Sequence, residues 1–155
     1  MKAALEMLKF NDDLFYKRIA SLSKEEVHAQ MNDELAPIIW NAGHLLNVRL
    51  GLLKQFGEQE GYDWQPLFRE KYDPAKTYPT VMEIWEAWKK CSQELFQKIE
   101  AATEEELTRE IKVNLPHSDS TIRGHIIFVL YHECWHYGQI AYMRRFQGME
   151  GLVPY

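Results

Sequence analysis

The sequence predicts an all-α protein, a four-helix bundle with a long aromatic-rich crossover between its second and third helices. The chain has 155 residues, of which 46% are hydrophobic, which is enough for a single domain over residues 1–155 with its own core. Four long segments place apolar residues at alternating spacings of three and four, the period of a helix with one buried face. The segment between the second and third helices is rich in proline and aromatic residues and lacks that period.

Composition excludes several classes of function. The formal net charge is -5, and the lysines and arginines are spread along the chain, so we expect no nucleic-acid partner. No apolar run is long enough to span a bilayer, and the first ten residues lack the apolar core of a signal peptide. Two cysteines in different segments, Cys91 and Cys134, fit a reducing compartment. We therefore expect a cytoplasmic protein with no membrane partner.

The first helix is expected over residues 2–22. Its seam includes Asp12, with Asn11 beside it, polar residues where a purely structural helix would carry aliphatic ones. They face either a polar site or solvent. After this helix, Ser23 and Glu26 form a capping box that predicts a short helical turn, in which His28 is expected to be exposed.

The second helix is expected over residues 33–56. Asn32 or Asp33 would cap it, and Pro37 would be tolerated near its first turn. One histidine, His44, lies beside its core seam. The residues of that seam are Ile38, Asn41, Leu45, Val48, Leu52 and Phe56.

Two glycines and the crossover also point to close packing around the second helix. Gly43 and Gly51 each lower helix stability by roughly 1 kcal/mol relative to alanine, so we expect a neighbouring helix to approach them closely. The crossover over residues 57–78 would either roof a pocket or plug the open end of the bundle.

The third helix begins at a second capping box, Thr80 to Glu83, and extends to about residue 99. Trp85 and Trp88 on its apolar face are expected in the core or at a dimer surface. Thr103 predicts another short helical turn, and the alternating residues 110–115 predict a short strand or an extended connector.

The fourth helix, over residues 121–147, carries the chemistry. His132 and His136 are four residues apart and therefore lie on one face, where two imidazoles can reach one metal ion. The alternative is a pair of buried histidines that are each satisfied by a neighbour. His125 lies about 10 Å along the helix from His132, too far to share the ion. Cys134 points away from His132 and is expected in the core, and Gln139 returns to the histidine face, where it would orient a ligand ring.

Residues 132–136 also match the His-Glu-x-x-His pattern of zinc peptidases, in which Glu133 would be the general base. The downstream extensions of that pattern are absent, and Glu150 is the only later acidic residue. A third ligand must therefore come from upstream, where His44 is the one histidine on a long helix beside its seam.

Four stretches of the sequence resemble the DinB-like family, which includes the YfiT-like proteins. They are the run Asn41 to Leu46, the run Trp64 to Phe68, the run His132 to Ile140 and the terminal Val153 to Tyr155, and Phe10 and Asn11 fit the same pattern. The resemblance implies a four-helix bundle, often dimeric, that holds one divalent ion, zinc or nickel. The three histidine ligands of the family map to His44, His132 and His136. Some members transfer or use low-molecular-weight thiols such as bacillithiol or mycothiol.

Three functions remain open at this point. The first is a metal-dependent enzyme that activates a thiol or water toward a small-molecule substrate, because three imidazoles leave a coordination position open. The second is a zinc hydrolase or peptidase that uses Glu133. The third is a non-enzymatic, metal-stabilised dimerisation module. Glu133, Gln139, Asn11 and Asn41 are candidates for supporting the ligands, and no residue is assigned a catalytic role.

Overall fold

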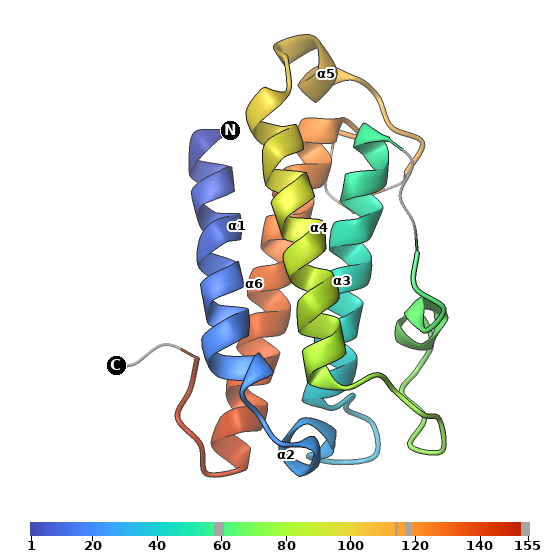
Figure 1. Ribbon diagram of the computed structural model, residues 1–155, viewed down its shortest axis with the longest axis vertical. Helices are drawn as coiled ribbons and strands as arrows, with labels where there is room; N and C mark the ends of the chain where they lie inside the picture. Colours follow the sequence, from blue (N-terminus) through green and yellow to red (C-terminus); the bar gives the residue numbers. More distant parts are fainter. Residues whose placement is uncertain (58–60, 114, 117–118, 153–155) are drawn as a thin grey trace.

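The computed structural model of the chain describes residues 1–57, 61–113, 115–116 and 119–152, and it is all-α (Figure 1). The predicted fold class is therefore confirmed at this level. His117 and the terminal Val153 to Tyr155 lie outside the described residues. Four long helices lie side by side: α1 (Lys2–Phe15), α3 (Ile38–Leu53), α4 (Val81–Ala101) and α6 (Ile122–Phe146). Both α1 and α3 pack against α4 and α6.

Short elements connect the long helices. They are the π-helical turn η1 (Tyr16–Ala20), α2 (Lys24–His28), the 3-10 turns η2 (Lys54–Phe56) and η3 (Gln65–Phe68), and α5 (Glu104–Thr108). The predicted capping boxes at Ser23 and Thr80 are both formed, and Thr103 caps α5. In the described part of the connector at residues 110–121, extended backbone pairs once, as an isolated bridge between Glu110 and Thr121.

The second long helix begins later than the sequence predicts. Its N-cap is Pro37, which has extended backbone angles, and the helix starts at Ile38 rather than near Asp33. Proline explains the difference, because it disfavours helical geometry in the residue before it. The rotation of α3 also differs, since Arg49 is buried where the seam was predicted to place Val48, which is half-buried.

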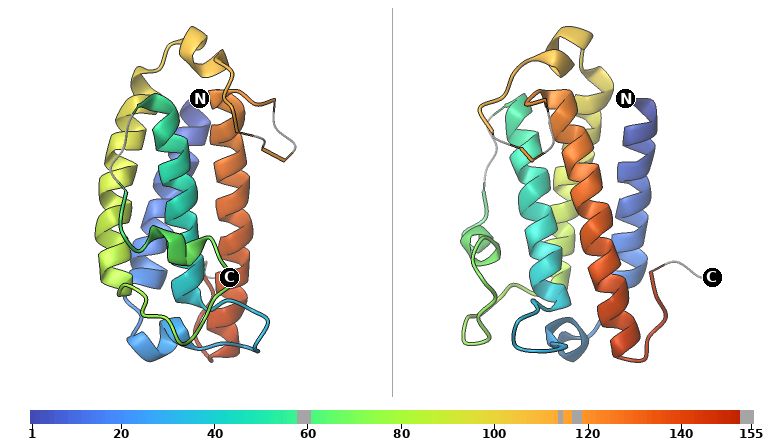
Figure 2. Two further views of the ribbon diagram at one scale, coloured as in Figure 1. Left: turned by 90° about the vertical axis from the view of Figure 1, so that its right-hand side faces the viewer. Right: turned by 180° about the vertical axis from the view of Figure 1, so that it is seen from behind.

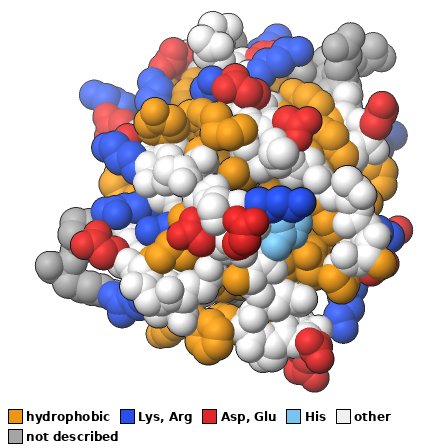
Figure 3. Space-filling view, turned by 60° about the horizontal axis from the view of Figure 1, so that its bottom comes forward, with side chains coloured by type: hydrophobic (Ala, Val, Ile, Leu, Met, Phe, Trp, Pro, Cys, Tyr) orange, Lys and Arg blue, Asp and Glu red, His pale blue; other side chains and the backbone are white. Residues whose placement is uncertain are grey.

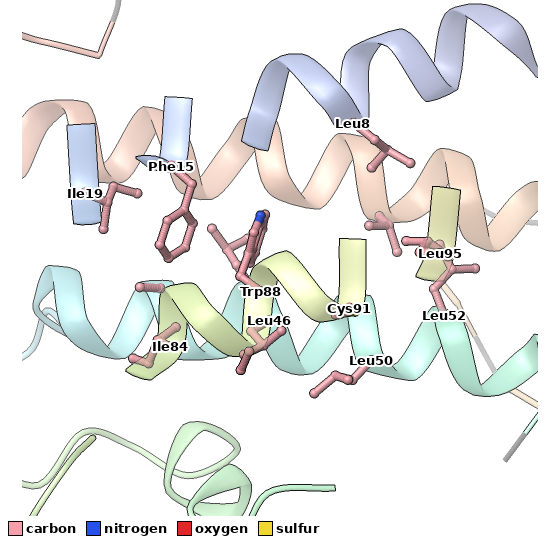
Figure 4. Close-up of a cluster of buried hydrophobic side chains, with 14 of the residues drawn as sticks. Leu8, Phe15, Ile19, Leu46, Leu50, Leu52, Ile84, Trp88, Cys91 and Leu95 are labelled. Atoms are coloured by element: carbon pink, nitrogen blue, oxygen red, sulfur yellow. The ribbon is translucent and has the colours of Figure 1, made fainter. Parts of the chain in front are cut away.

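The hydrophobic core lies between the four long helices (Figure 4). Trp88 is fully buried at its centre and packs against Phe15, with ring centroids 4.6 Å apart. Trp85 is buried beside them, so both tryptophans of the α4 face belong to the core. The side chains labelled in Figure 4 show α1, η1, α3 and α4 contributing to one cluster: Leu8, Phe15, Ile19, Leu46, Leu50, Leu52, Ile84, Trp88, Cys91 and Leu95.

The described part of the crossover lies along the outer side of α3 rather than across an end of the helices (Figure 2). Asn47 donates from Nδ2 to the Gln65 carbonyl at 2.8 Å, and Gln65 donates back from Nε2 to Asn47 Oδ1 at 3.1 Å. A Cβ at Gly43 would lie 2.3 Å from the Phe68 ring. The close approach at Gly43 is therefore made by the crossover, not by a neighbouring helix, and a Cβ at Gly51 would meet nothing within 4 Å.

The surface mixes charged and apolar side chains, as the lower end of the molecule shows (Figure 3). Within the described residues, none of the helices combines the length and the apolar character needed to cross a membrane. Two side chains differ from expectation. Cys134 is exposed rather than in the core, because the buried face of α6 includes its neighbour Glu133 instead. His28 is half-buried beside Tyr72 rather than exposed.

Candidate metal centre

Packing of α3 against α6 brings three histidine rings together. His44 comes from the middle of α3, and His132 and His136 come from successive turns of α6. The Nε2 atom of His132 lies 3.2 Å from Nε2 of His44 and 3.2 Å from Nε2 of His136. All three nitrogens lie within 4.8 Å of one another. We call these three residues the histidine cluster.

Hydrogen bonds orient two of the three rings. Nδ1 of His44 lies 3.0 Å from the carbonyl oxygen of Phe68, to which it can only donate. Nδ1 of His136 lies 2.8 Å from Oδ1 of Asn41. That amide is itself fixed, because Asn41 Nδ2 donates to the carbonyls of Ala36 and Pro37 at 3.1 and 3.0 Å. Both rings therefore carry their proton on Nδ1 and direct the lone pair of Nε2 into the cluster.

Burial keeps the cluster neutral. Burial and, to a smaller extent, the neighbouring histidines together lower the pKa of His132 to about 4 and the pKa of His136 to about 3. Burial also lowers the pKa of His44, although its bond to Phe68 opposes the shift. At neutral pH all three rings are unprotonated at one nitrogen, which is the form that binds a metal ion.

The cluster has the ligand atoms of a metal site, but without an ion some of its ring nitrogens lack hydrogen-bond partners. A proton on Nε2 of His132 can serve only one of its two neighbours, so at least one Nε2 lone pair of the cluster is left without a donor. Nδ1 of His132 is buried without a hydrogen-bond partner. A cation between the rings would remove this conflict. Tetrahedral zinc with bonds of about 2.0 to 2.1 Å separates its nitrogen ligands by about 3.3 to 3.4 Å, close to the observed 3.2 Å.

Comparison with known proteins agrees with this geometry. A sequence model described as the DinB superfamily matches residues 7–140, a span that contains all three histidines. The chain belongs to the DinB superfamily. A search among curated proteins found no match.

Two of the predicted supporting residues of this DinB-superfamily chain lie at the cluster. Asn41 fixes the ring of His136, as described above. Gln139 forms a side-chain hydrogen bond with the same ring, which raises the pKa of His136 against the larger effect of burial. Gln139 was expected on the face of His132, two turns away. Its contact is instead with His136, which lies one turn before it on the same helix.

The other two predicted supporting residues, Glu133 and Asn11, lie elsewhere. The side chain of Glu133 is 0% exposed, and both of its oxygens accept hydrogen bonds from Arg49. Asn11 donates from Nδ2 to Glu133 Oε2 at 2.7 Å. The position of Glu133 next to His132 in sequence explains this outcome, because one residue turns the helix by about 100° and so moves the carboxylate off the histidine face. The Glu133 carboxylate is therefore directed at Arg49.

Glu133 instead belongs to a second buried cluster, which we call the arginine network. At its centre, all five N–H groups of Arg49 are used: Nε and Nη2 donate to Glu133, Nη1 donates to Asp12 and to Ser92 Oγ, and Nη2 also donates to the Leu8 carbonyl. The guanidinium carbon of Arg49 lies 3.9 Å from the centroid of the Trp88 ring. The network links α1, α3, α4 and α6.

Sequence reasoning missed two features that position the site. The predicted seam contains Val48 and not Arg49. The spacing allows either, because Arg49 lies three residues before the buried Leu52, which is also a helical core spacing. The Phe68 carbonyl, which orients His44, could not be predicted from the sequence. Every residue has a backbone carbonyl, and the path of the chain decides which one reaches the ring. Gly43 was the available indication that some segment approaches α3 at this level.

A cavity of about 390 Å³ lies directly beside His136. It is bordered by the segment before α3, the first turn of α3 and the C-terminal half of α6, and none of the described crossover residues lines it. The described part of the crossover therefore does not roof this cavity. It supports the histidine cluster from the other side of α3, where Phe68 binds His44 and the Glu70 carbonyl accepts from Trp40 Nε1 at 2.9 Å.

Proposed function

We propose that this member of the DinB superfamily is a metal-dependent enzyme that uses a small thiol or water as nucleophile. The observation that carries the proposal is the convergence of three Nε2 lone pairs from His44, His132 and His136. Within the described residues, no carboxylate or thiolate joins them as a fourth ligand. Three protein ligands with a free position are typical of catalytic ions rather than closed structural ones. The donor set suits one zinc or nickel ion.

The residues around the cluster have defined roles in this proposal. The three histidines would hold the ion, and Phe68 and Asn41 would keep two of the rings in the ligating tautomer. When bound, the ion lowers the pKa of a thiol or water at its free position, which makes a nucleophile available near neutral pH. Trp40 stacks on His44, with ring centroids 4.7 Å apart and planes within 10°, and so shields that side of the site from solvent.

The alternative functions find less support. A peptidase of the His-Glu-x-x-His type needs Glu133 as its base, and here that carboxylate is buried and held by Arg49. A purely structural ion would not require the free coordination position. We also propose that the four long helices form a four-helix bundle that serves as scaffold for the site, and that the protein works in the cytoplasm, where its two cysteines stay reduced.

Metal-dependent conjugation tests the proposed reaction. Purified protein loaded with zinc or nickel should accelerate the attack of bacillithiol on chlorodinitrobenzene, and water should be tested in parallel with esters and lactones. His132→Ala should abolish the activity, whereas Cys91→Ala and Cys134→Ala should retain it, which excludes a protein thiol as nucleophile. Absence of metal-dependent turnover with every thiol and every hydrolysable substrate would favour the non-enzymatic module instead.

We further propose that the protein is a homodimer and that the outer face of α6 is its interface. This face is directed toward the viewer in the right-hand view of Figure 2. Between Arg123 and Arg144 the sequence contains no lysine or arginine, and its one acidic residue, Glu133, is buried. The large exposed side chains there are apolar or aromatic instead, each 57–72% exposed: Ile127, Tyr131, Trp135 and Tyr142. Phe146, 62% exposed, extends the face one turn beyond Tyr142.

The size of this face suits a second copy. Each aromatic side chain carries about 150–250 Å² of surface, so four that are more than half exposed contribute roughly 500 Å² of the roughly 800 Å² per partner in a stable interface. Gly138 lies exposed in the middle of the face with nothing near its Cβ position, although glycine destabilises a helix by about 1 kcal/mol. Close approach of another helix would explain it.

Sedimentation equilibrium at micromolar concentration tests the dimer. Wild-type protein should sediment as a dimer, and Trp135→Glu should convert it to a monomer. Tyr16→Glu is a matched control, because Tyr16 is also 57% exposed but stacks on Trp85 of α4. A monomeric wild type, or equal effects of the two substitutions, would contradict the proposed interface.

A further inference from the structure

We propose that the cavity beside His136 binds a neutral, mainly apolar small molecule. The inference rests on the proposed function, because the bound molecule would be the electrophilic acceptor of that reaction. The volume of about 390 Å³ lies within the roughly 300–1,000 Å³ of small-molecule sites. Its wall includes the ring of His136, so a molecule held there lies next to one of the three candidate ligands.

The lining predicts an apolar ligand. Most of the wall is aliphatic, aromatic or thioether surface. These residues are Met31, Leu35, Ala36, Trp40, Tyr142 and Met143. Removing a ligand's apolar surface from water against such a wall contributes about 25 cal/mol per Å². The two methionines also allow the wall to adapt to ligands of different shape, because their side chains are unbranched and polarizable.

The absence of charge from this wall predicts that the ligand is neutral. Among the residues that line the cavity there is no lysine, arginine, aspartate or glutamate. An ion that entered would lose its hydration without gaining a partner of opposite charge, which is strongly unfavourable. The imidazole of this wall, His136, offers an ion no free partner, because its Nδ1 lies 2.8 Å from Asn41 Oδ1 and its Nε2 lies 3.2 Å from His132 Nε2.

The Gln139 amide of the wall remains able to recognise the ligand. Asn41 is committed, because its amide nitrogen donates to Ala36 and Pro37 and its oxygen faces His136. Gln139 has an amide with two donors and an acceptor, of which the bond to His136 uses one. A ligand with a carbonyl or hydroxyl group would therefore place that group at Gln139, and its apolar part would extend toward Leu35 and Met31.

Binding of three probes of equal length tests the charge preference. Hexanamide, hexanoate and hexylammonium differ mainly in charge, and each is titrated into metal-free protein, with binding followed by NMR at the indole N–H of Trp40. We expect saturable shifts with hexanamide and binding at least about tenfold weaker for both ions. Equal binding of the three probes, or no effect of hexanamide at Trp40, would overturn the inference.

Two substitutions in the lining locate the binding. Ala36→Phe should fill the cavity and weaken hexanamide binding about tenfold or more. Leu35→Lys should reverse the preference toward hexanoate, because it adds a cation to the wall. Met7→Lys is the matched control: Met7 and Leu35 are both 43% exposed, and Met7 lies on α1 outside the cavity. Unchanged binding in Ala36→Phe, or the same reversal in Met7→Lys, would contradict the assignment.

The experiment separates this inference from the proposed function. The probe titrations need neither metal nor turnover, so binding of hexanamide without any metal-dependent activity would support the cavity and contradict the enzyme. Conversely, metal-dependent turnover of an apolar electrophile that Ala36→Phe leaves unchanged would support the enzyme and overturn the cavity as its acceptor site.

Discussion

Two polar clusters lie between the helices of this protein, and both include residues of α6. His132 belongs to the histidine cluster, and its neighbour Glu133 belongs to the arginine network. In the arginine network, every N–H group of Arg49 has an acceptor and its positive charge is paired with the carboxylates of Glu133 and Asp12. In the histidine cluster, at least one Nε2 lone pair has no donor and Nδ1 of His132 has no partner. The arginine network is complete within the chain, whereas the histidine cluster would be completed by a cation. The arginine network therefore stabilises the fold, and the histidine cluster is a candidate binding site.

Removal of Arg49 should have the largest effect on stability. Arg49→Met leaves Glu133 buried without its partner, which is expected to lower the free energy of unfolding by about 3–5 kcal/mol. Urea denaturation followed by circular dichroism measures it. Arg123→Met is the control, because its pair with Glu104 is exposed and should contribute no more than about 1 kcal/mol. A similar small loss in both variants would mean that the arginine network is not the stabilising cluster.

Two glycines on α3 test how the crossover supports the histidine cluster. Gly43→Ala places a methyl group in the Phe68 ring, so we expect a loss of about 1–3 kcal/mol and weaker metal binding through the displaced Phe68 carbonyl. Gly51→Ala, on the same helix, meets nothing and should increase stability by about 0.5–1 kcal/mol. The pair is compared by thermal unfolding and zinc titration. Equal effects would contradict the role given to the crossover.

Asn41 tests whether the orientation of His136 matters for the ion. Asn41→Leu removes the acceptor for Nδ1 and should weaken metal binding about 10- to 100-fold, the usual effect of losing such a partner. Competition with a chromogenic chelator gives the affinity. Gln55→Leu is the control, since the Gln55 side chain donates to the Gly51 carbonyl at 3.2 Å rather than contacting a histidine ring or the crossover. If Asn41→Leu binds the ion as tightly as wild type, the hydrogen bond does not prepare the ligand.

Buried histidines should make the metal-free protein less stable in acid. Burial lowers the pKa of His125 from 6.5 to about 4, so between these values the unfolded chain binds more protons than the folded one. The free energy of unfolding should therefore decrease as the pH falls from about 6.5 toward 4, with His125 contributing at most about 1.4 kcal/mol per pH unit. His125→Leu should reduce this slope in urea titrations at several pH values. An unchanged slope would contradict the shift.

The helices could be predicted from the sequence. Which polar groups of the two clusters find partners within the chain could not. Capping residues such as Ser23, Thr80 and Thr103 are local, and they begin their helices as predicted. The spacing of His132 and His136 is also local, because it depends on one helix alone. The place of His44 in the cluster depends on the packing of α3 against α6, and the sequence indicated it through the shortage of other candidates and through family resemblance.

The features that the sequence missed all depend on rotation about a helix axis or on backbone position. Glu133 has the residue type and the motif position of a general base, but its direction follows from which face of α6 is buried. Arg49 has a charged side chain and therefore does not look like a core residue until its partners from α1 and α6 are known. Similarly, the Phe68 carbonyl becomes a partner of His44 only when the crossover lies against Gly43.

Metal analysis of single histidine variants tests the central claim most directly. Wild-type protein and His125→Ala, equilibrated with zinc and freed of excess, should each retain about one ion per chain. His44→Ala, His132→Ala and His136→Ala should each lose it while remaining folded, because each removes one of the three converging nitrogens. Retention of one ion per chain in all three variants would contradict the assignment of the histidine cluster as the metal site.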